Sequence, residues 1–192
     1  MSKLIALCIG HSRIVNGHQD GGAVALDHKT SEWIFNSELA KSACAALADL
    51  GIPATIISRY EGIGYEHAQE WLAGELKRLD AGAALELHFN DSDNPASNGH
   101  EFLFWHGSTR GNALATALDK RMDLLMPMIR HRDLVAITGT DRGAAFLRGT
   151  PCPAVIVESF FGSNHDDFEN AVRFIETLAK VIALGIRDWL AA

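Results

Sequence analysis

Three chemically versatile side chains stand where predicted buried strands end. His11 and His88 each follow a short apolar run, and Glu158 ends the apolar run of residues 154–157. In an open α/β sheet the carboxyl ends of parallel strands meet at one edge, where ligands bind. A carboxylate at the end of a buried strand costs free energy unless something at that edge uses it. We therefore predict that these three side chains share one site.

A fourth residue, Glu38, lies in the first turn of a helix predicted to begin near residue 36 or 37. Zinc in hydrolytic sites commonly takes three ligands from His and Asp/Glu and leaves the fourth position to water. His11, Glu38 and His88 would supply such a set. Each also has an ordinary explanation: the chain has nine histidines, and the helix dipole favours a carboxylate in a first turn. A shared site is favoured because these residues occur at element ends that a parallel sheet would bring together.

The apolar pattern predicts strands alternating with helices. Strands are expected at residues 4–9, 52–58, 83–87, 101–105 and 154–157, with shorter ones at 134–137 and near 144–147. Helices are expected from about residue 36 or 37 to residue 50 and over residues 66–79, 113–125 and 165–190. The alternation indicates a three-layer α/β sandwich with a mostly parallel sheet of about six strands. We interpret residues 1–192 as a single domain.

The composition is that of one acidic, well-filled domain. A chain of 192 residues with 47% hydrophobic residues is long enough for one core and too short for two comfortable ones. The net charge of −7, with no cluster of Lys and Arg, argues against nucleic acid and anionic membranes as partners. Three scattered cysteines, Cys8, Cys44 and Cys152, are interpreted as free thiols in a reducing compartment.

Neither a membrane span nor an export signal is expected. No run of about 18 apolar residues occurs, so we predict no membrane insertion. The apolar part of the N-terminal stretch is very short and leads directly into Gly10-His11, with no small-residue cleavage site. We interpret it as the first core strand and expect synthesis in the cytoplasm without a signal peptide.

A series of short motifs follows the chain in order: Gly10-His11, Asp20-Gly-Gly-Ala23, Glu38 opening a helix, Ile57-Ser58-Arg59, Glu86-Leu-His88-Phe-Asn90, Gly99-His-Glu101-Phe, Pro153-Ala-Val-Ile-Val-Glu158 and Phe161-Gly-Ser-Asn164. Together these motifs resemble the zinc-dependent N-acetylmuramoyl-L-alanine amidases of the AmiC/CwlV type. The resemblance spans nearly the whole chain. Any one motif is weak, but the ordered set is fairly specific.

The resemblance implies a reaction and a role for each site residue. It implies His11, Glu38 and His88 as ligands of Zn²⁺ and Glu158 as the catalytic carboxylate. The implied substrate is peptidoglycan or a muropeptide, cleaved at the amide between the lactyl group of N-acetylmuramic acid and L-alanine. Glu158 would take a proton from the attacking water and hand it to the leaving amine.

Three more polar residues are weaker candidates for contacts with the substrate or with the ligands: Asn90, Glu101 and Arg142. Ordinary surface or structural roles are an equal alternative for them. Segment 127–150 is hard to assign. It is the only candidate for the helix that plugs the site in some members of the family.

Two other functions stay open. A related zinc hydrolase of small anionic substrates, such as an N-formylglutamate amidohydrolase or a carboxypeptidase, should gather arginines at its pocket, and Arg13, Arg59, Arg142 and Arg148 are available for this. A catalytically inactive binding module on the amidase fold would hold zinc without turnover, although all four acidic and histidine positions are present. A wall hydrolase with no export signal and no separate wall-binding module fits a phage or prophage endolysin.

Overall fold

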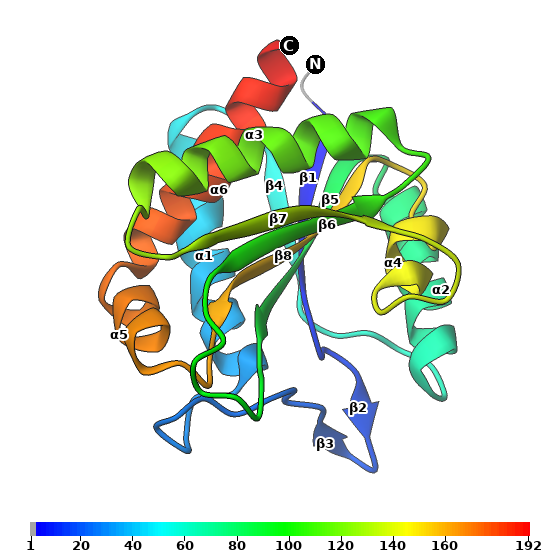
Figure 1. Cartoon of the computed structure of the whole chain (residues 1–192). Helices are drawn as coiled ribbons and strands as arrows, with labels where there is room; N and C mark the ends of the chain where they lie inside the picture. Colours follow the sequence, from blue (N-terminus) through cyan, green and yellow to red (C-terminus); the bar gives the residue numbers. More distant parts are fainter. Residues whose placement is uncertain (1–2) are drawn as a thin grey trace.

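A six-stranded sheet organises the protein, as Figure 1 shows for the computed structural model, which describes residues 3–192. Across the sheet the strands are β4 (Ala54–Ile57), β1 (Leu4–Ile9), β5 (Ala81–Asn90), β8 (Ala154–Phe161), β6 (His100–Trp105) and β7 (His131–Ile137). The first four are mutually parallel, whereas β6 runs antiparallel to β8 and parallel to β7. A small hairpin, β2 (Ile14–Val15) with β3 (His18–Gln19), follows β1.

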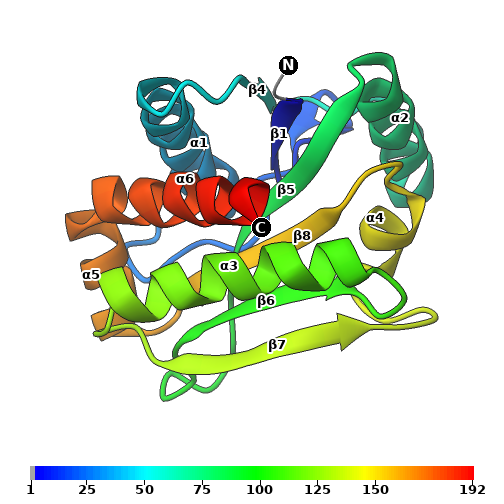
Figure 2. The ribbon, with the colours of Figure 1, turned by 90° about the horizontal axis from the view of Figure 1, so that it is seen from above.

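Helices cover both faces of this sheet (Figure 2). One face carries α1 (Glu32–Asp49), α3 (Thr109–Leu125) and α6 (Ile175–Ala191), with α5 (His165–Arg173) beside them. The other face carries α2 (Tyr65–Arg78) and α4 (Ala144–Gly149). The prediction of a three-layer α/β sandwich with a mostly parallel, six-stranded sheet is confirmed. No helix among residues 3–192 is both long and apolar enough to cross a membrane.

Each central strand is buried on both faces, and its side chains alternate between two cores. In β8, Val155 and Val157 belong to the core under α1, α3 and α6, whereas Ala154 and Ile156 belong to the core under α2 and α4. Because side chains alternate with a period of two, Glu158 follows Ile156 onto the α2 and α4 face. The same alternation in β5 sends Glu86 and His88 to that face.

Three predicted elements differ from the structure. Residues 144–147, predicted as a strand, form the helix α4. The helix predicted over residues 165–190 divides at Phe174 into α5 and α6. The helix predicted from residue 36 or 37 begins at Glu32, because the Ser31 side chain accepts a hydrogen bond from the backbone N–H of Ile34 and caps the helix there. The last difference changes which carboxylate reaches the site.

Candidate active site and metal centre

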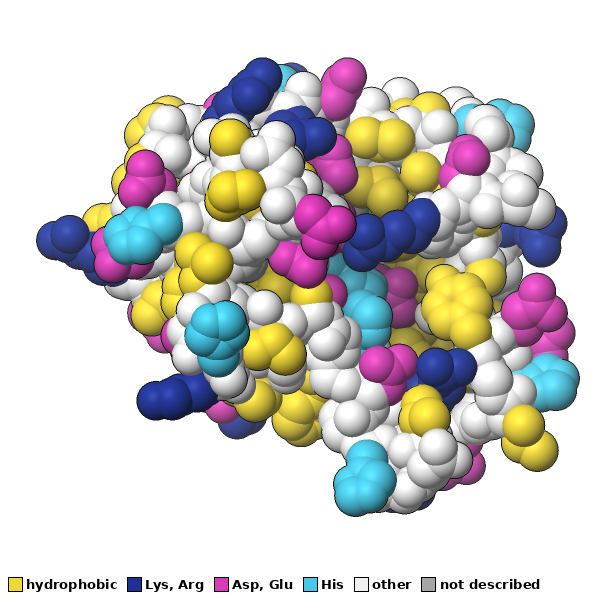
Figure 3. All heavy atoms as spheres, turned by 60° about the horizontal axis from the view of Figure 1, so that its bottom comes forward, with side chains coloured by type: hydrophobic (Ala, Val, Ile, Leu, Met, Phe, Trp, Pro, Cys, Tyr) yellow, Lys and Arg dark blue, Asp and Glu magenta, His cyan; other side chains and the backbone are white. Residues whose placement is uncertain are grey.

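The site lies at the carboxyl edge of β1, β5 and β8. His11 comes two residues after β1, in a left-handed backbone conformation with φ of 57°. His88 lies near the end of β5 and is in register with Glu158 on β8. On this face of the molecule, histidine and acidic side chains lie in a hollow bordered by basic and apolar side chains (Figure 3). The strand ends therefore meet at one edge, as their positions in the sequence predict.

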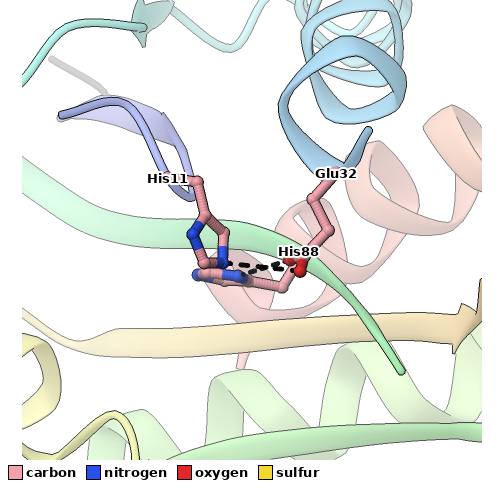
Figure 4. A group of neighbouring side chains, drawn as sticks. All are labelled: His11, Glu32 and His88. Carbon is pink, nitrogen blue, oxygen red and sulfur yellow. Dashed lines mark hydrogen bonds and ion pairs between the residues drawn. The ribbon is translucent and has the colours of Figure 1, made fainter. Parts of the chain in front are cut away.

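A buried carboxylate, Glu32, joins the two histidines (Figure 4). Its Oε1 lies 3.4 Å from Nε2 of His11, and its Oε2 lies 3.0 Å from Nδ1 of His88. One ligand atom from each residue can be chosen so that all three lie within 4.8 Å of one another. Two imidazoles and one carboxylate form a donor set that suits a divalent transition metal. The three residues can therefore hold a metal ion.

The outer nitrogen of each imidazole faces another carboxylate. Nε2 of His88 lies 3.3 Å from Oε2 of Glu86, and Nδ1 of His11 lies 3.6 Å from Oδ1 of Asp20. In metal centres a carboxylate on the far nitrogen fixes the tautomer and orientation of a ligating histidine. Glu86 is placed to orient His88 in this way, and Asp20 lies near the far nitrogen of His11.

Glu86 is itself held by two hydrogen bonds. Tyr60 donates its hydroxyl to Oε1 over 3.2 Å, and Gln69 donates its side-chain N–H to the same oxygen over 3.3 Å. Burial raises the pKa of Glu86, but His88 and these two donors outweigh it and leave the pKa below its usual value. Glu86 is therefore an anion fixed in place behind His88.

Two glycines give the imidazole rings their space. A Cβ atom on Gly10 would overlap the ring of His88, and a Cβ on Gly22 would lie 2.6 Å from Cδ2 of His11. Gly22 also has a φ of 71°, which other residues rarely adopt. The site therefore depends on glycine at both positions.

In the metal-free protein, the carboxylates favour protonation of the two histidines. Burial lowers the pKa of His88, but Glu32 and Glu86 outweigh it and raise the pKa well above its usual value. The pKa of His11 is raised as well, because Glu32 outweighs the effect of burial. The same pairing outweighs the burial of Glu32 and holds its pKa below the usual value. Protons and a metal cation therefore compete for these imidazoles.

Glu158 lines a cavity together with the two histidines but is not part of the group that could hold a metal ion. The cavity has a volume of about 490 Å³, and its lining includes His11, His88 and Glu158. Among the described residues, Oε2 of Glu158 has no hydrogen-bond partner, while Oε1 lies 3.5 Å from Nη2 of Arg142. Burial raises the pKa of Glu158 to about 7, against the opposing effects of His88 and Arg142. A carboxyl group with such a pKa can accept and return a proton near neutral pH.

Comparison with known protein families assigns the chain to one of them. A family model described as N-acetylmuramoyl-L-alanine amidase matches residues 5–188. The chain belongs to this amidase family. It is accordingly an N-acetylmuramoyl-L-alanine amidase, an enzyme that acts on peptidoglycan. A comparison with curated protein sequences found no match.

Solved amidase structures share the fold. The catalytic domain of CwlV from Bacillus (Paenibacillus) polymyxa var. colistinus has a TM-score of 0.81 at 23% identity, with 98% of each chain covered. AmiC2 of Nostoc punctiforme has a TM-score of 0.79 at 23% identity, covering 99% of this chain and 98% of its own. The catalytic domain of the CD27L endolysin, which targets Clostridia difficile, has a TM-score of 0.80 at 22% identity, with 97% of each chain covered.

The structure corrects the prediction for Glu38 in this amidase. Glu38 is exposed on α1 and pairs with Lys41, whose Nζ lies 2.7 Å from its Oε1. It comes six residues after Glu32, which is about 240° around a helix of 3.6 residues per turn. Glu38 therefore cannot join His11 and His88, and Glu32 takes that place. Ser31 as a helix cap was the signal in the sequence that would have indicated Glu32.

The three weaker candidates have different positions. Arg142 lines the cavity and approaches Glu158. The described residues that line the cavity do not include Asn90 or Glu101. Instead, Asn90 donates its side-chain N–H to Glu101 over 2.9 Å, and Glu101 is the cross-strand neighbour of Glu158. Asn90 and Glu101 thus lie beside Glu158 but outside the cavity lining, and of the three candidates only Arg142 lines the cavity.

Segment 127–150 forms one wall of the cavity. It contains β7, a turn and α4, and its residues 139–145 and Arg148 line the cavity. Arg13 and Arg142 also line it, so three of the four scattered arginines converge there, whereas Arg59 is not part of the lining. The rival hydrolases would require such a convergence, but acidic residues line the same cavity, and Arg13 and Arg142 are paired with Asp20 and Glu158.

Proposed function

We propose that this amidase holds one zinc ion with His11, Glu32 and His88 and moves protons with Glu158. The observation that carries the proposal is that one buried carboxylate contacts both histidines, beside a second carboxylate, Glu158, whose Oε2 has no hydrogen-bond partner among the described residues. Three protein ligands leave a coordination position open, which is the pattern of catalytic zinc sites. The fit rests on the donor chemistry and on the carboxylates that orient both rings.

A zinc ion bound there would supply Lewis acidity, which lowers the pKa of water and polarises the scissile carbonyl. Glu158 takes one proton from the attacking water, whose oxygen bonds to the carbonyl carbon of the lactyl group. The carbon–nitrogen bond then breaks, and Glu158 returns the proton to the amine of L-alanine. Its pKa of about 7 allows both transfers.

Arg142 and the other arginines assist through charge. Arg142 lies 3.5 Å from Glu158 and favours the ionised carboxylate that must accept the proton. Arg142, Arg13 and Arg148 line the cavity among acidic residues, and their guanidinium groups suit the carboxylates of a peptide substrate. The cavity therefore supports binding of an anionic stem peptide next to the reacting amide.

The test combines product analysis with one substitution. Purified peptidoglycan digested by the wild-type protein should give fragments with a free L-alanine amino group and an intact glycan, identified by mass spectrometry. Glu158→Gln should keep the fold and the metal content but lose about 10²–10⁴ in rate, the usual contribution of general acid–base catalysis. Glu66→Gln is the matched control, because Glu66 lines the same cavity but is not one of the proposed donors.

Two results would overturn the proposal. One is cleavage of the glycan or of peptide bonds between stem residues. The other is near-wild-type turnover by Glu158→Gln.

A further inference from the structure

A second cluster of histidines and carboxylates lies under α3, on the face opposite the amidase cavity. His100 and His131 are the first residues of β6 and β7 and stand opposite each other in the ladder. Asp119 and Asp123 are one turn apart on α3, which lies along these two strands in Figure 2. None of the four lines the amidase cavity, so the mechanism proposed above does not account for them.

Three of the four side chains, those of His100, Asp119 and His131, converge at metal-ligand spacing. Oδ1 of Asp119 lies 3.3 Å from Nε2 of His100 and 3.4 Å from Nε2 of His131. Oδ1 of Asp123 lies 3.7 Å from Nε2 of His100. Ligands about 2.0–2.1 Å from a tetrahedral zinc ion stand about 3.3 Å apart. The observed separations are therefore close to those of a formed site.

The two imidazole rings stack beside one carboxylate. The imidazoles of His100 and His131 stack with their centroids 5.5 Å apart and their planes 8° from parallel. Their Nε2 atoms both reach the same oxygen of Asp119. Ligand atoms of His100, Asp119 and His131 can be chosen within 4.8 Å of one another. Asp123, on the next turn of α3, lies beside this group, 3.7 Å from Nε2 of His100 and 3.7 Å from Nδ1 of His131.

The charges of the cluster call for a cation. Asp119 is buried, and within residues 3–192 no Lys or Arg makes an ion pair with Asp119 or Asp123. Their ion-pair partners are the two histidines. Buried carboxylates are paired with cations or bind metals.

We propose that His100, Asp119 and His131 form a second binding site, for zinc or a similar divalent transition metal, with a structural role. Imidazole and carboxylate donors suit this class of ion. The three donors join α3 to two strands and lie outside the amidase cavity, which suits a structural rather than a catalytic ion. A bound ion would tie α3 to the first residues of β6 and β7. It would thereby close the connection of residues 126–130 and fix β7, which is the edge strand of the sheet.

The test counts metal ions. After dialysis against micromolar zinc, we expect two equivalents in the wild-type protein and one in His131→Gln. We also expect one in Glu32→Gln and none in Glu32→Gln/His131→Gln. Substitution of a residue that only hydrogen-bonds to a metal ligand typically lowers metal affinity about 10–100-fold. His131 is a proposed ligand itself, so the second zinc ion should bind at least about 100-fold more weakly to His131→Gln. His165→Gln is the matched control, because His165 is an exposed histidine beside Asp166 and Glu169 on α5.

A second measurement addresses the structural role. Zinc should raise the thermal midpoint of Glu32→Gln, which keeps only the proposed second site, and should leave that of Glu32→Gln/His131→Gln unchanged. Co²⁺ titration of the wild-type protein needs no substitution and should show two successive equivalents in the visible spectrum. Because His131 is half-exposed, its substitution should leave the fold intact.

The outcomes separate this site from the amidase centre. The proposal is overturned if the wild-type protein binds one equivalent that Glu32→Gln removes. It is also overturned if His131→Gln and Asp119→Asn both keep the full wild-type metal content, which would mean that the cluster is held by hydrogen bonds alone. The comparison of wild type with His131→Gln does not depend on Glu32, so an error in the proposed amidase ligands would not affect it.

Discussion

Glu32 and Glu38 offer a matched pair of substitutions on one helix. Both are acidic residues of α1, but Glu32 is buried between two imidazoles while Glu38 is exposed beside Lys41. Glu32→Gln keeps the size of the side chain and one carbonyl oxygen but removes the negative charge. Glu38→Gln makes the same chemical change on the solvent side of the helix. Any difference between the two variants therefore reports position rather than the loss of a carboxylate.

The expected magnitudes follow from these positions. Substitution of a residue that only hydrogen-bonds to a metal ligand usually lowers metal affinity about 10–100-fold. Glu32 is one of three proposed ligands and the only anion among them, so its substitution should lower zinc affinity more than that. A loss of at least about 100-fold corresponds to about 2.7 kcal/mol. Glu38 forms an exposed pair with Lys41 three residues later, and such pairs contribute about 0.3–0.5 kcal/mol. Its substitution should leave zinc affinity unchanged.

The assay is zinc competition with a chelator of known affinity, beside chemical denaturation and amidase turnover. Glu32→Gln should lose metal at chelator concentrations that the wild-type amidase centre tolerates and should lose turnover in parallel, with partial recovery in excess zinc. Glu38→Gln should match the wild type in both measurements. If Glu38→Gln lost its zinc while Glu32→Gln kept both metal and activity, our assignment of the third ligand would be refuted.

Two further predictions concern pH and space. Because the pKa values of His11 and His88 are raised in the metal-free fold, protons should displace zinc as pH falls through the histidine range, measurable as zinc content between pH 8 and pH 5. The pairing of His11 and His88 with carboxylates should stabilise the metal-free fold fully below their unfolded pKa of about 6.5. This stabilisation should disappear as pH rises through their raised folded-state pKa values. A higher denaturation midpoint of the metal-free protein at pH 9 than at pH 6 would therefore contradict the pairing. Gly10→Ala should displace the ring of His88 and cost metal and turnover, at about 1–3 kcal/mol of stability. Gly74→Ala, in α2 with no atom within 4 Å of the added Cβ, should instead stabilise by about 0.5–1 kcal/mol, and equal metal loss in both variants would refute the role of Gly10.

The edge of the sheet was predictable because parallel strands obey a simple rule. Apolar runs buried on both faces are recognisable in the sequence, and each delivers its next residue to the same edge. This rule placed His11, His88 and Glu158 together, and the structure does bring them together. The order of strands and the reversed direction of β6 and β7 could not be derived in this way, because they depend on long-range pairing.

The third carboxylate was missed because helix starts are set by caps rather than by apolar spacing. The apolar residues of α1 are most regular from Leu39 onward, so the pattern alone suggests a start near residue 36 or 37. The true first turn carries Glu32 and is defined by a single side-chain hydrogen bond from Ser31. Similarly, residues 144–147 are a short apolar run, and such runs fit a strand or a helix equally well.

The two histidine and carboxylate clusters differ in what can reach them, and this difference determines what a metal bound at each could do. The cluster of His11, Glu32 and His88 opens into a cavity that also contains Glu158, so a substrate and a proton carrier have access to it. The cluster of His100, Asp119 and His131 lies between α3 and two strands, outside that cavity and away from Glu158. Zinc content by itself would therefore not measure amidase competence. If both proposed sites bind zinc, an inactive preparation could still retain an ion under α3. Only the joint measurement of stoichiometry and turnover would then distinguish loss of the proposed catalytic ion from loss of the proposed structural one.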